Sequence, residues 1–472
     1  MINLTAEKLA EIVGGKVLSQ GESSFTGFGT DTRSDLADQL FVALKGETFD
    51  AHKFLSQACD QGARVLLVHD SSAVEESVLS RAGVVLVGDT LVALGQLATW
   101  WRRHNDFQVV AITGSNGKTT TKRMADQLLS GTMKTHTASG SFNNHWGVPF
   151  SILSASEDTE ALVLEMGMNA LGEISKLCKI AEPDVVVCTM VGTAHIGELG
   201  SQENIAKAKW EIYESCPDAM KIFNYDNEFT IEMHEKAKTL WPDQKFVLFS
   251  SFRKESDVFL RAMSSNLKGI DVSGSVFGYE GSAQVPVVGR HNIVNLAAAC
   301  SIALALGVEP AQVWAQMPLI TGEWGRNQLL KAQGGATILF DGYNANPDSM
   351  AMLMKNLLEI EVTGKKIVVL GEMFELGEFS EEKHEQLGEM VGMTDIEVIW
   401  FVGPSCRAFE AGLKKADFSK TYFISDSYKE SLASQMASML EPDDIVAVKG
   451  SRGMKLEKVV VDFDPLNFPQ KS

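Results

Sequence analysis

Residues 109–122 read VVAITGSNGKTTTK and are informative about both the fold and the function. Its hydrophobic start indicates a buried β-strand, and the Gly-Lys-Thr sequence that follows indicates a turn into a helix. Glycines let backbone N–H groups converge on a phosphate, a lysine adds a mobile positive charge, and a threonine hydroxyl can bind Mg²⁺. The full pattern requires a glycine where this chain has Ile112. The stretch therefore predicts a shortened phosphate loop that binds a nucleotide.

The composition is that of an ordinary globular chain of 472 residues, with 45% hydrophobic and 22% charged residues. A formal charge of −19 repels polyanions, which predicts that nucleic acid is not a partner. The six cysteines show no CxxC spacing and indicate thiols in a reducing compartment. Neither a signal peptide nor an apolar stretch long enough to span a bilayer is evident. We therefore expect a cytoplasmic protein without an integral membrane segment.

Alternating strand-like and helical segments predict an α/β fold with three domains, at residues 1–90, 91–317 and 318–472. The first begins with a short helix after Thr5 that ends at Gly14. Continuous aliphatic runs in the central block, such as VVAIT, EALVLEM and DVVVCTM, predict a parallel sheet buried on both faces. The third block repeats the pattern, from ATILFDGY to DIVAVKG, and predicts a Rossmann-like sheet without a GxGxxG sequence.

Three further side chains are candidates for chemistry on their positions alone. Glu165 ends an apolar strand, which is the usual place for the acidic residue of a nucleotide-bound magnesium site. His195 follows the strand DVVVCTM, at the edge where open α/β sheets bind ligands. Lys209 lies on a helix with small apolar neighbours, but its spacing alone favours a surface lysine on an amphipathic helix.

Taken together, GSNGKTT, EMG, TAHI, SQENIAKAKWEI, GRHNIVN and DGYNANPDSM closely resemble the Mur ligase family, the ATP-dependent amide-forming enzymes of peptidoglycan precursor synthesis. The resemblance covers essentially the whole chain. Within the family, DGYNANPDSM, the early DTRSDLADQLFVALKGETFDAHKF and the late VKGSRGMKLE resemble the last cytoplasmic ligase. This implies UDP-N-acetylmuramoyl-tripeptide (UDP-MurNAc-tripeptide) and D-alanyl-D-alanine (D-Ala-D-Ala) as substrates, ATP as the energy source and a monomeric enzyme. It also implies a first domain that binds the uridine diphosphate and a central phosphate-loop ATPase domain.

The resemblance also implies the residues that contact ATP. They come from the phosphate loop and three later motifs: Thr113, Gly114, Ser115, Asn116, Gly117, Lys118, Thr119, Asn292, Asn295, Arg326 and Asp341. In the family, the lysine of the loop holds the β- and γ-phosphates and the two asparagines lie near the adenine. Arg326 and Asp341 match third-domain residues that close over the γ-phosphate and the ribose. The implied catalytic residues are Lys118, Glu165, His195, Lys209 and Arg326.

Two magnesium ions are implied as well. Thr119 and Glu165 match the ligands of the first ion, and His195 and a carbamylated Lys209 those of the second. The family often has a histidine where this chain has Ala170, which leaves His195 as the metal candidate nearby. The implied substrate-binding residues lie in the uridine-diphosphate segment and in the loop at 139–149: Asp31, Thr32, Arg33, Lys45, Asn143 and Asn144.

Other functions fit the sequence less well. The sister ligase that adds the third residue of the peptide carries DNPR, which this chain lacks, and DYAHTPD in place of DGYNANP. Folylpolyglutamate synthetases have their phosphate loop much nearer the N-terminus. A GTPase-type switch usually carries NKxD, and no Asn-Lys dipeptide occurs here. The sequence leaves open whether the third peptide residue is lysine or diaminopimelate, and which group deprotonates the attacking amine.

Overall fold

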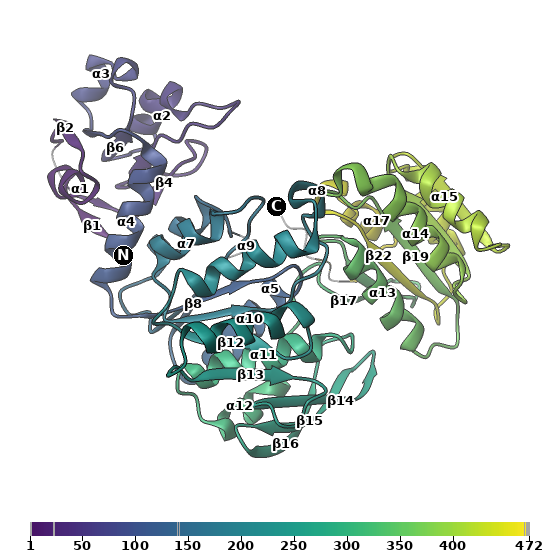
Figure 1. Ribbon diagram of the computed structural model, residues 1–472. Coiled ribbons are helices and arrows are strands. Elements are labelled where there is room, and N and C mark those ends of the chain that lie inside the picture. Colours follow the sequence, from purple (N-terminus) through teal and green to yellow (C-terminus); the bar gives the residue numbers. More distant parts are fainter. Residues whose placement is uncertain (1, 22–23, 139, 141, 467, 469–472) are drawn as a thin grey trace. The chain divides into compact units, whose positions relative to one another are not determined.

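The computed structural model describes residues 2–21, 24–138, 140, 142–466 and 468 (Figure 1). Ser139 and Ser141, at the start of the predicted substrate loop, lie outside the described residues. The chain forms two compact units. The first unit comprises residues 1–112, 132–186 and 211–219, and the second unit comprises residues 113–131, 187–210 and 220–472. Within the described residues, every helix is too short or too polar to cross a membrane.

The N-terminal part of the first unit is a five-stranded sheet of order β2-β7-β6-β5-β4, parallel except between β2 and β7. The predicted first helix is confirmed: Thr5 caps its start, and Gly14 ends it with φ 61°. The elements are β1 (Asn3–Leu4), α1 (Ala6–Val13), β2 (Lys16–Ser19), β3 (Phe25–Thr26), β4 (Phe28–Gly29), β5 (Leu40–Val42), α2 (Leu55–Asp60), β6 (Val65–Val68), α3 (Glu76–Leu79), β7 (Gly83–Leu86) and α4 (Thr90–His104).

The rest of the first unit contains three parallel strands in the order β8-β10-β9. Glu165 ends β10 and is paired with Ile112 of β8, so both lie at the carboxyl edge of these strands. The elements are β8 (Gln108–Thr113), β9 (Thr135–Thr137), α6 (Gly147–Ser154), β10 (Ala161–Glu165) and α7 (Glu173–Ala181). Three elements cross the division between the units: β8, whose last residue Thr113 belongs to the second unit, β11 (Val185–Cys188) and α9 (Gln202–Glu214).

The second unit begins with α5 and contains the strands β12 to β16. Parallel pairing joins β12, β13 and β14, whereas β14, β15 and β16 form antiparallel hairpins. Buried and partly buried residues alternate along β15, which fits an antiparallel sheet with one face more open to solvent. The elements are α5 (Lys118–Leu129), α8 (Ile196–Leu199), β12 (Met220–Asn224), α10 (Glu228–Leu240), β13 (Phe246–Ser250), β14 (Val258–Asn266), β15 (Gly269–Val276), β16 (Tyr279–Val285), α11 (Asn292–Ala305) and α12 (Pro310–Gln316).

The C-terminal part of the second unit is a six-stranded sheet of order β17-β18-β22-β19-β20-β21, green to yellow in Figure 1. All pairs are parallel except β17 with β18, and the sheet has a hydrophobic core on each face. Helices α13 to α15 cover one face, and α16 and α17 cover the other. This confirms the predicted Rossmann-like sheet. The elements are β17 (Gln328–Lys331), β18 (Thr337–Asp341), α13 (Pro347–Glu359), β19 (Lys366–Gly371), α14 (Ser380–Gly392), β20 (Val398–Val402), α15 (Cys406–Lys415), β21 (Thr421–Ser425), α16 (Glu430–Met439), β22 (Ile445–Lys449) and α17 (Glu457–Asp462).

Candidate active site

The phosphate loop connects β8 to α5, and two of its glycines adopt backbone conformations that other residues avoid. Gly114 has φ 146° and Gly117 has φ 85°. A Cβ on Gly114 would lie 1.9 Å from Oγ1 of Thr189, and a Cβ on Gly117 would lie 2.2 Å from Oδ1 of Asn295. Glycine is therefore required at both positions by close packing as well as by φ. The predicted glycine turn between strand and helix is confirmed.

The segment after β11 holds this loop in shape through hydrogen bonds. Oγ1 of Thr189 donates to the carbonyl oxygen of Asn116 at 2.6 Å. The backbone N–H of Ser115 donates to the carbonyl of Met190 at 2.9 Å, and the N–H of Gly192 donates to Oγ of Ser115 at 2.9 Å. The loop is thus supported from outside by the protein's own backbone and side chains.

Lys118, His195 and Lys209 influence one another electrostatically within the second unit. Burial and the charges of Lys118 and Lys209 lower the pKa of His195 to about 3. Burial and the charge of Lys118 lower the pKa of Lys209 to about 7, although Cys188 acts in the opposite direction. At neutral pH the imidazole is therefore uncharged, and a large fraction of Lys209 is the neutral amine.

The side chain of Lys209 is buried, with 1% of the residue exposed. The helical spacing favoured a surface lysine, and that interpretation is wrong. Its neighbours Ile205, Ala208 and Ile212 on α9 are also buried, so more than one face of this helix is buried. A lysine is rarely buried to this extent without a charged partner or a functional reason.

Arg326 brings a positive charge from the C-terminal part of the second unit to the phosphate loop. Its Nη2 donates to Oγ1 of Thr119 at 3.0 Å, and its guanidinium carbon lies 4.4 Å from the ring centre of Tyr343. Thr119 is only 3% exposed. The structure thus brings together two residues that are 207 positions apart in the sequence and that were both predicted to contact ATP.

Two further contacts join the phosphate-loop region to the start of α13, and their residues were missed as site residues. Nδ2 of Asn346 donates to Oδ1 of Asn116 at 2.9 Å, while Oδ1 of Asn346 accepts from the N–H of Ser349 and so caps the helix. Oδ2 of Asp348 accepts from the N–H and Oγ1 of Thr193 at 2.7 and 2.9 Å. The motif DGYNANPDSM, residues 341–350, contains both residues, but the resemblance implied a role only for its Asp341.

The other predicted nucleotide residues of the second unit are held by neighbouring groups. Nδ2 of Asn292 donates to a backbone carbonyl at 2.8 Å, and Nδ2 of Asn295 donates to Oδ1 of Asn292 at 3.0 Å. Asp341 ends β18 and accepts from Nζ of Lys449 at 2.6 Å, in a pair that is almost fully buried. Lys449 was not predicted as a site residue. Burial lowers its pKa.

In the first unit, Glu165 ends β10 and Asn143 lies near that strand end, whereas Asn144 lies near the start of α6. Glu165 is 2% exposed. The carbonyl of Asn143 accepts from the N–H of Gly167 at 2.8 Å, two residues beyond Glu165. Oδ1 of Asn144 accepts from the N–H of Gly147, the first residue of α6, at 2.9 Å. Asn143 is therefore close to the EMG motif, whereas the amide oxygen of Asn144 has a structural partner.

The predicted uridine-diphosphate residues are mostly exposed and pair with each other or with neighbours. Nη2 of Arg33 donates to Asp31 at 2.6 Å, which lowers the pKa of Asp31 to about 2, and the Arg33 side chain is 86% exposed. Lys45 lies 3.4 Å from Asp50. Thr32 is buried. These charged side chains are thus placed on the surface without a fixed ligand geometry.

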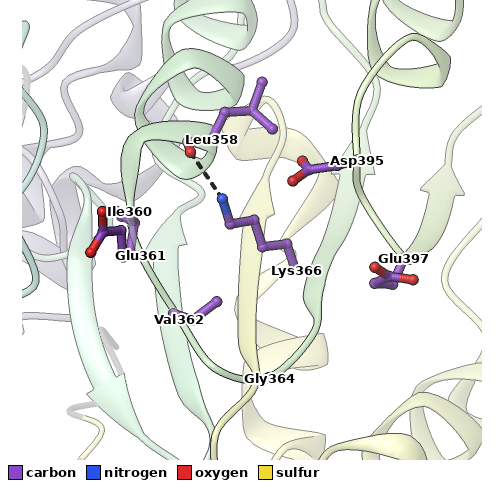
Figure 2. A pocket seen from close by; sticks show the side chains of 8 residues that line it. All are labelled: Leu358, Ile360, Glu361, Val362, Gly364, Lys366, Asp395 and Glu397. Carbon is purple, nitrogen blue, oxygen red and sulfur yellow. Dashed lines mark hydrogen bonds between the residues drawn. The ribbon is translucent and has the colours of Figure 1, made fainter.

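A hollow in the C-terminal sheet lies away from these residues (Figure 2). Its lining includes Lys366, Glu397 and Leu358, and Nζ of Lys366 donates to the carbonyl of Leu358 at 2.9 Å. Lys366 begins β19 and Glu397 precedes β20, so the hollow is at the amino ends of the strands. Open α/β sheets bind ligands at the carboxyl ends, where Asp341 and Lys449 lie. We therefore do not assign the hollow to the nucleotide.

Comparisons with known proteins agree with this arrangement. Residues 112–303 match the Mur ligase middle domain, and residues 325–452 match the Mur ligase glutamate ligase domain. The UDP-N-acetylmuramoyl-tripeptide–D-alanyl-D-alanine ligase of Bacillus subtilis (strain 168) is 34% identical over 467 residues, which are 98% of this chain and 99% of that protein.

Solved structures give the same result. A crystal structure of MurF from Acinetobacter baumannii matches with a TM-score of 0.87 and 30% identity, covering 98% of this chain and 99% of that one. The MurF ligase of Thermotoga maritima in complex with ADP matches with a TM-score of 0.78 and 27% identity, covering 93% and 96%. The chain belongs to the Mur ligase family, in the group whose members are named MurF.

Proposed function

We propose that this chain is an ATP-dependent ligase that joins D-Ala-D-Ala to UDP-MurNAc-tripeptide and releases ADP and phosphate. The observation that carries the proposal is the contact between Arg326 and Thr119 at the phosphate loop. Transfer of a phosphoryl group to a carboxylate brings two anions together, and a guanidinium from another segment reduces their repulsion. The choice of substrates rests on the full-length match to the relatives.

In the proposed reaction, an oxygen of the tripeptide carboxylate attacks the γ-phosphorus of ATP. The bond to the β–γ bridging oxygen breaks, ADP leaves and an acyl phosphate remains. The amine of D-Ala-D-Ala, after losing a proton, attacks the acyl carbon, and the C–O bond to phosphate breaks to leave an amide. Lys118 holds the β- and γ-phosphates, and Arg326 offsets the negative charge of the transferring group.

We propose that two magnesium ions bind, and the chemistry of the proposed ligands supports this. Thr119 and Glu165, the proposed holders of the first ion, are buried oxygen donors. His195, proposed for the second, is neutral at physiological pH because its pKa is lowered to about 3, and an imidazole offers a lone pair to a metal only when one ring nitrogen is unprotonated. When bound, the ions supply positive charge that offsets the repulsion between the carboxylate and ATP.

Carbamylation of Lys209 completes the proposed second site. The neutral amine attacks the carbon of CO₂, an N–C bond forms, and the lost proton goes to solvent, which leaves a carbamate anion. A pKa of about 7 makes this step accessible near neutral pH. The modification also replaces a buried cation that repels Lys118 by an anion that attracts it.

The remaining proposals follow the family resemblance. The chain has three domains at residues 1–90, 91–317 and 318–472, acts as a monomer and is cytoplasmic. The third domain closes over ATP, because closure excludes water from the acyl phosphate. The proposed ligand contacts are uridine diphosphate with Asp31, Thr32, Arg33 and Lys45, the muramoyl peptide with Asn143 and Asn144, adenine with Asn292 and Asn295, and ribose with Asp341.

Phosphate release from ATP tests the assignment. The purified chain is given UDP-MurNAc-tripeptide with and without D-Ala-D-Ala, and the product mass is measured. We expect release that depends on the dipeptide and a product heavier by D-Ala-D-Ala minus water. Parallel reactions with UDP-MurNAc-dipeptide and diaminopimelate or lysine, and with a folate and glutamate, test the alternative ligases. Turnover in one of these, without incorporation of D-Ala-D-Ala, would reject the proposal.

A further inference from the structure

Two loops of the second unit touch through their backbones beside His195. The N–H of Gly197 in α8 donates to the carbonyl of Glu375 at 3.2 Å. A Cβ on Gly197 would lie 2.6 Å from the nitrogen of Gly377, and a Cβ on Gly377 would lie 3.1 Å from Cα of Gly197. The second loop follows β19 of the C-terminal sheet and ends in a short 3₁₀ turn, Gly377–Phe379. Side chains larger than hydrogen at Gly197 would keep the loops apart.

The residues that face each other across this contact have an unusual backbone. His195 has φ 67° and Glu375 has φ 64°, although neither is glycine. Such left-handed conformations are unfavourable for residues other than glycine, and they persist only where the surroundings enforce them. Two of them in one contact indicate that the loops hold these side chains in a defined position.

The side chains of this pair approach each other at one ring nitrogen. Nδ1 of His195 lies 3.1 Å from Oε2 of Glu375, and the two side chains are 18% and 48% exposed. Nδ1 is buried and has no hydrogen-bond partner in the orientation that the ring adopts. The distance between the two atoms is already that of a hydrogen bond, so only the relative orientation of the two groups departs from one.

We propose that Glu375 is a positioning residue that fixes the tautomer of His195. Its carboxylate accepts the Nδ1 hydrogen, so the unprotonated lone pair is on Nε2, the nitrogen that then faces a magnesium ion as ligand. This inference rests on the proposed function of His195 as a metal ligand. It adds that the C-terminal domain prepares the ligand, since Glu375 comes from the loop after β19.

The tautomer of His195 is the direct test. In metal-free protein labelled with ¹⁵N-histidine, the two ring nitrogens are assigned by loss of their signals in His195→Gln. Wild type should show hydrogen on Nδ1 alone. Glu375→Ala should move the population toward the Nε2–H form, while Glu375→Gln should retain Nδ1–H because its amide oxygen accepts. An unchanged tautomer in folded Glu375→Ala would overturn the proposal.

A second measurement covers the metal, with Glu378→Ala as the matched control in the same exposed turn. Binding of Mn²⁺ to the protein–ATP complex, followed by electron paramagnetic resonance, should weaken about tenfold or more in Glu375→Ala. It should be unchanged in Glu378→Ala and largely restored in Glu375→Gln. Equal affinities in all four proteins would contradict the proposal. If wild type fails to form the ligase product but the tautomer still responds to Glu375, the proposed function fails and the positioning role stands.

Discussion

The phosphate-loop region and the predicted uridine-diphosphate segment differ in the burial of their polar side chains. Around the loop, Thr119 and Lys209 are buried, and the backbone is supported by hydrogen bonds that need no ligand. In the N-terminal segment, Arg33 and Lys45 are exposed and bind neighbouring carboxylates. A buried, pre-arranged group acts strongly on its neighbours, whereas an exposed pair is screened by water. The comparison predicts large effects for changes in the first region and small ones in the second.

The largest effect is expected from Lys209→Ala, because this change removes the group that would carry the carbamate. We expect turnover to fall by ~10³-fold or more, with partial recovery when a short carboxylic acid such as acetate or propionate is added. Steady-state kinetics with and without the acid measure both. Full activity of the variant would contradict carbamylation.

Gly117→Ala should cost both stability and ATP binding. Its Cβ would overlap Oδ1 of Asn295, and its φ of 85° disfavours alanine. Gly172 is the matched control, since it also precedes a helix with φ 85° but has nothing within 4 Å of a Cβ. We expect Gly117→Ala to lower Tm by ~5 °C or more and weaken ATP binding by at least about tenfold, and Gly172→Ala to lower Tm only. Equal ATP affinities in both variants would show that the overlap is absent.

The pH dependence of activation should follow the pKa of Lys209, which lies at about 7. Only the neutral amine attacks CO₂, and its fraction falls as pH falls through the pKa. Enzyme stripped of CO₂ should therefore regain activity about tenfold more slowly at pH 6 than at pH 8, at the same concentration of dissolved CO₂. Lag times in the product assay measure this. Recovery at equal rates at the two pH values would contradict a pKa of about 7 for Lys209.

Asn346→Ser separates the contact with Asn116 from the capping of α13, because serine also caps helices. We expect kcat to fall by about tenfold, the equivalent of one lost hydrogen bond in a buried setting, with Tm nearly unchanged. A large loss of Tm would instead indicate that Asn346 acts mainly through the helix.

The smallest effect is expected from Arg33→Ala in the exposed segment. The KM for the UDP-linked substrate should rise by less than about fivefold at physiological salt, and the rise should shrink as salt is added. Tm should not change. A rise as large as that of a buried-site variant would mean that Arg33 is ordered by the substrate far more than its 86% exposed side chain indicates.

Much of the fold could be predicted because its signals are local. The aliphatic runs of β18 to β22 and the glycines at 114 and 117 are each read from a few consecutive residues. The burial of Lys209 could not be read this way, since helical spacing does not reveal that several faces of α9 are covered. The contacts of Asn346, Asp348 and Glu375 join segments more than 100 residues apart, and no local pattern encodes such partners.

The most direct test of the central claim, ATP-dependent ligation through an acyl phosphate, follows one oxygen atom. UDP-MurNAc-tripeptide labelled with ¹⁸O in its terminal carboxylate is converted with ATP and D-Ala-D-Ala, and the released phosphate is analysed by mass spectrometry. If the carboxylate attacks the γ-phosphorus, its attacking oxygen leaves with the phosphate. Each released phosphate should then carry a single ¹⁸O atom. Phosphate that carries no ¹⁸O, while the amide product forms, would contradict the account.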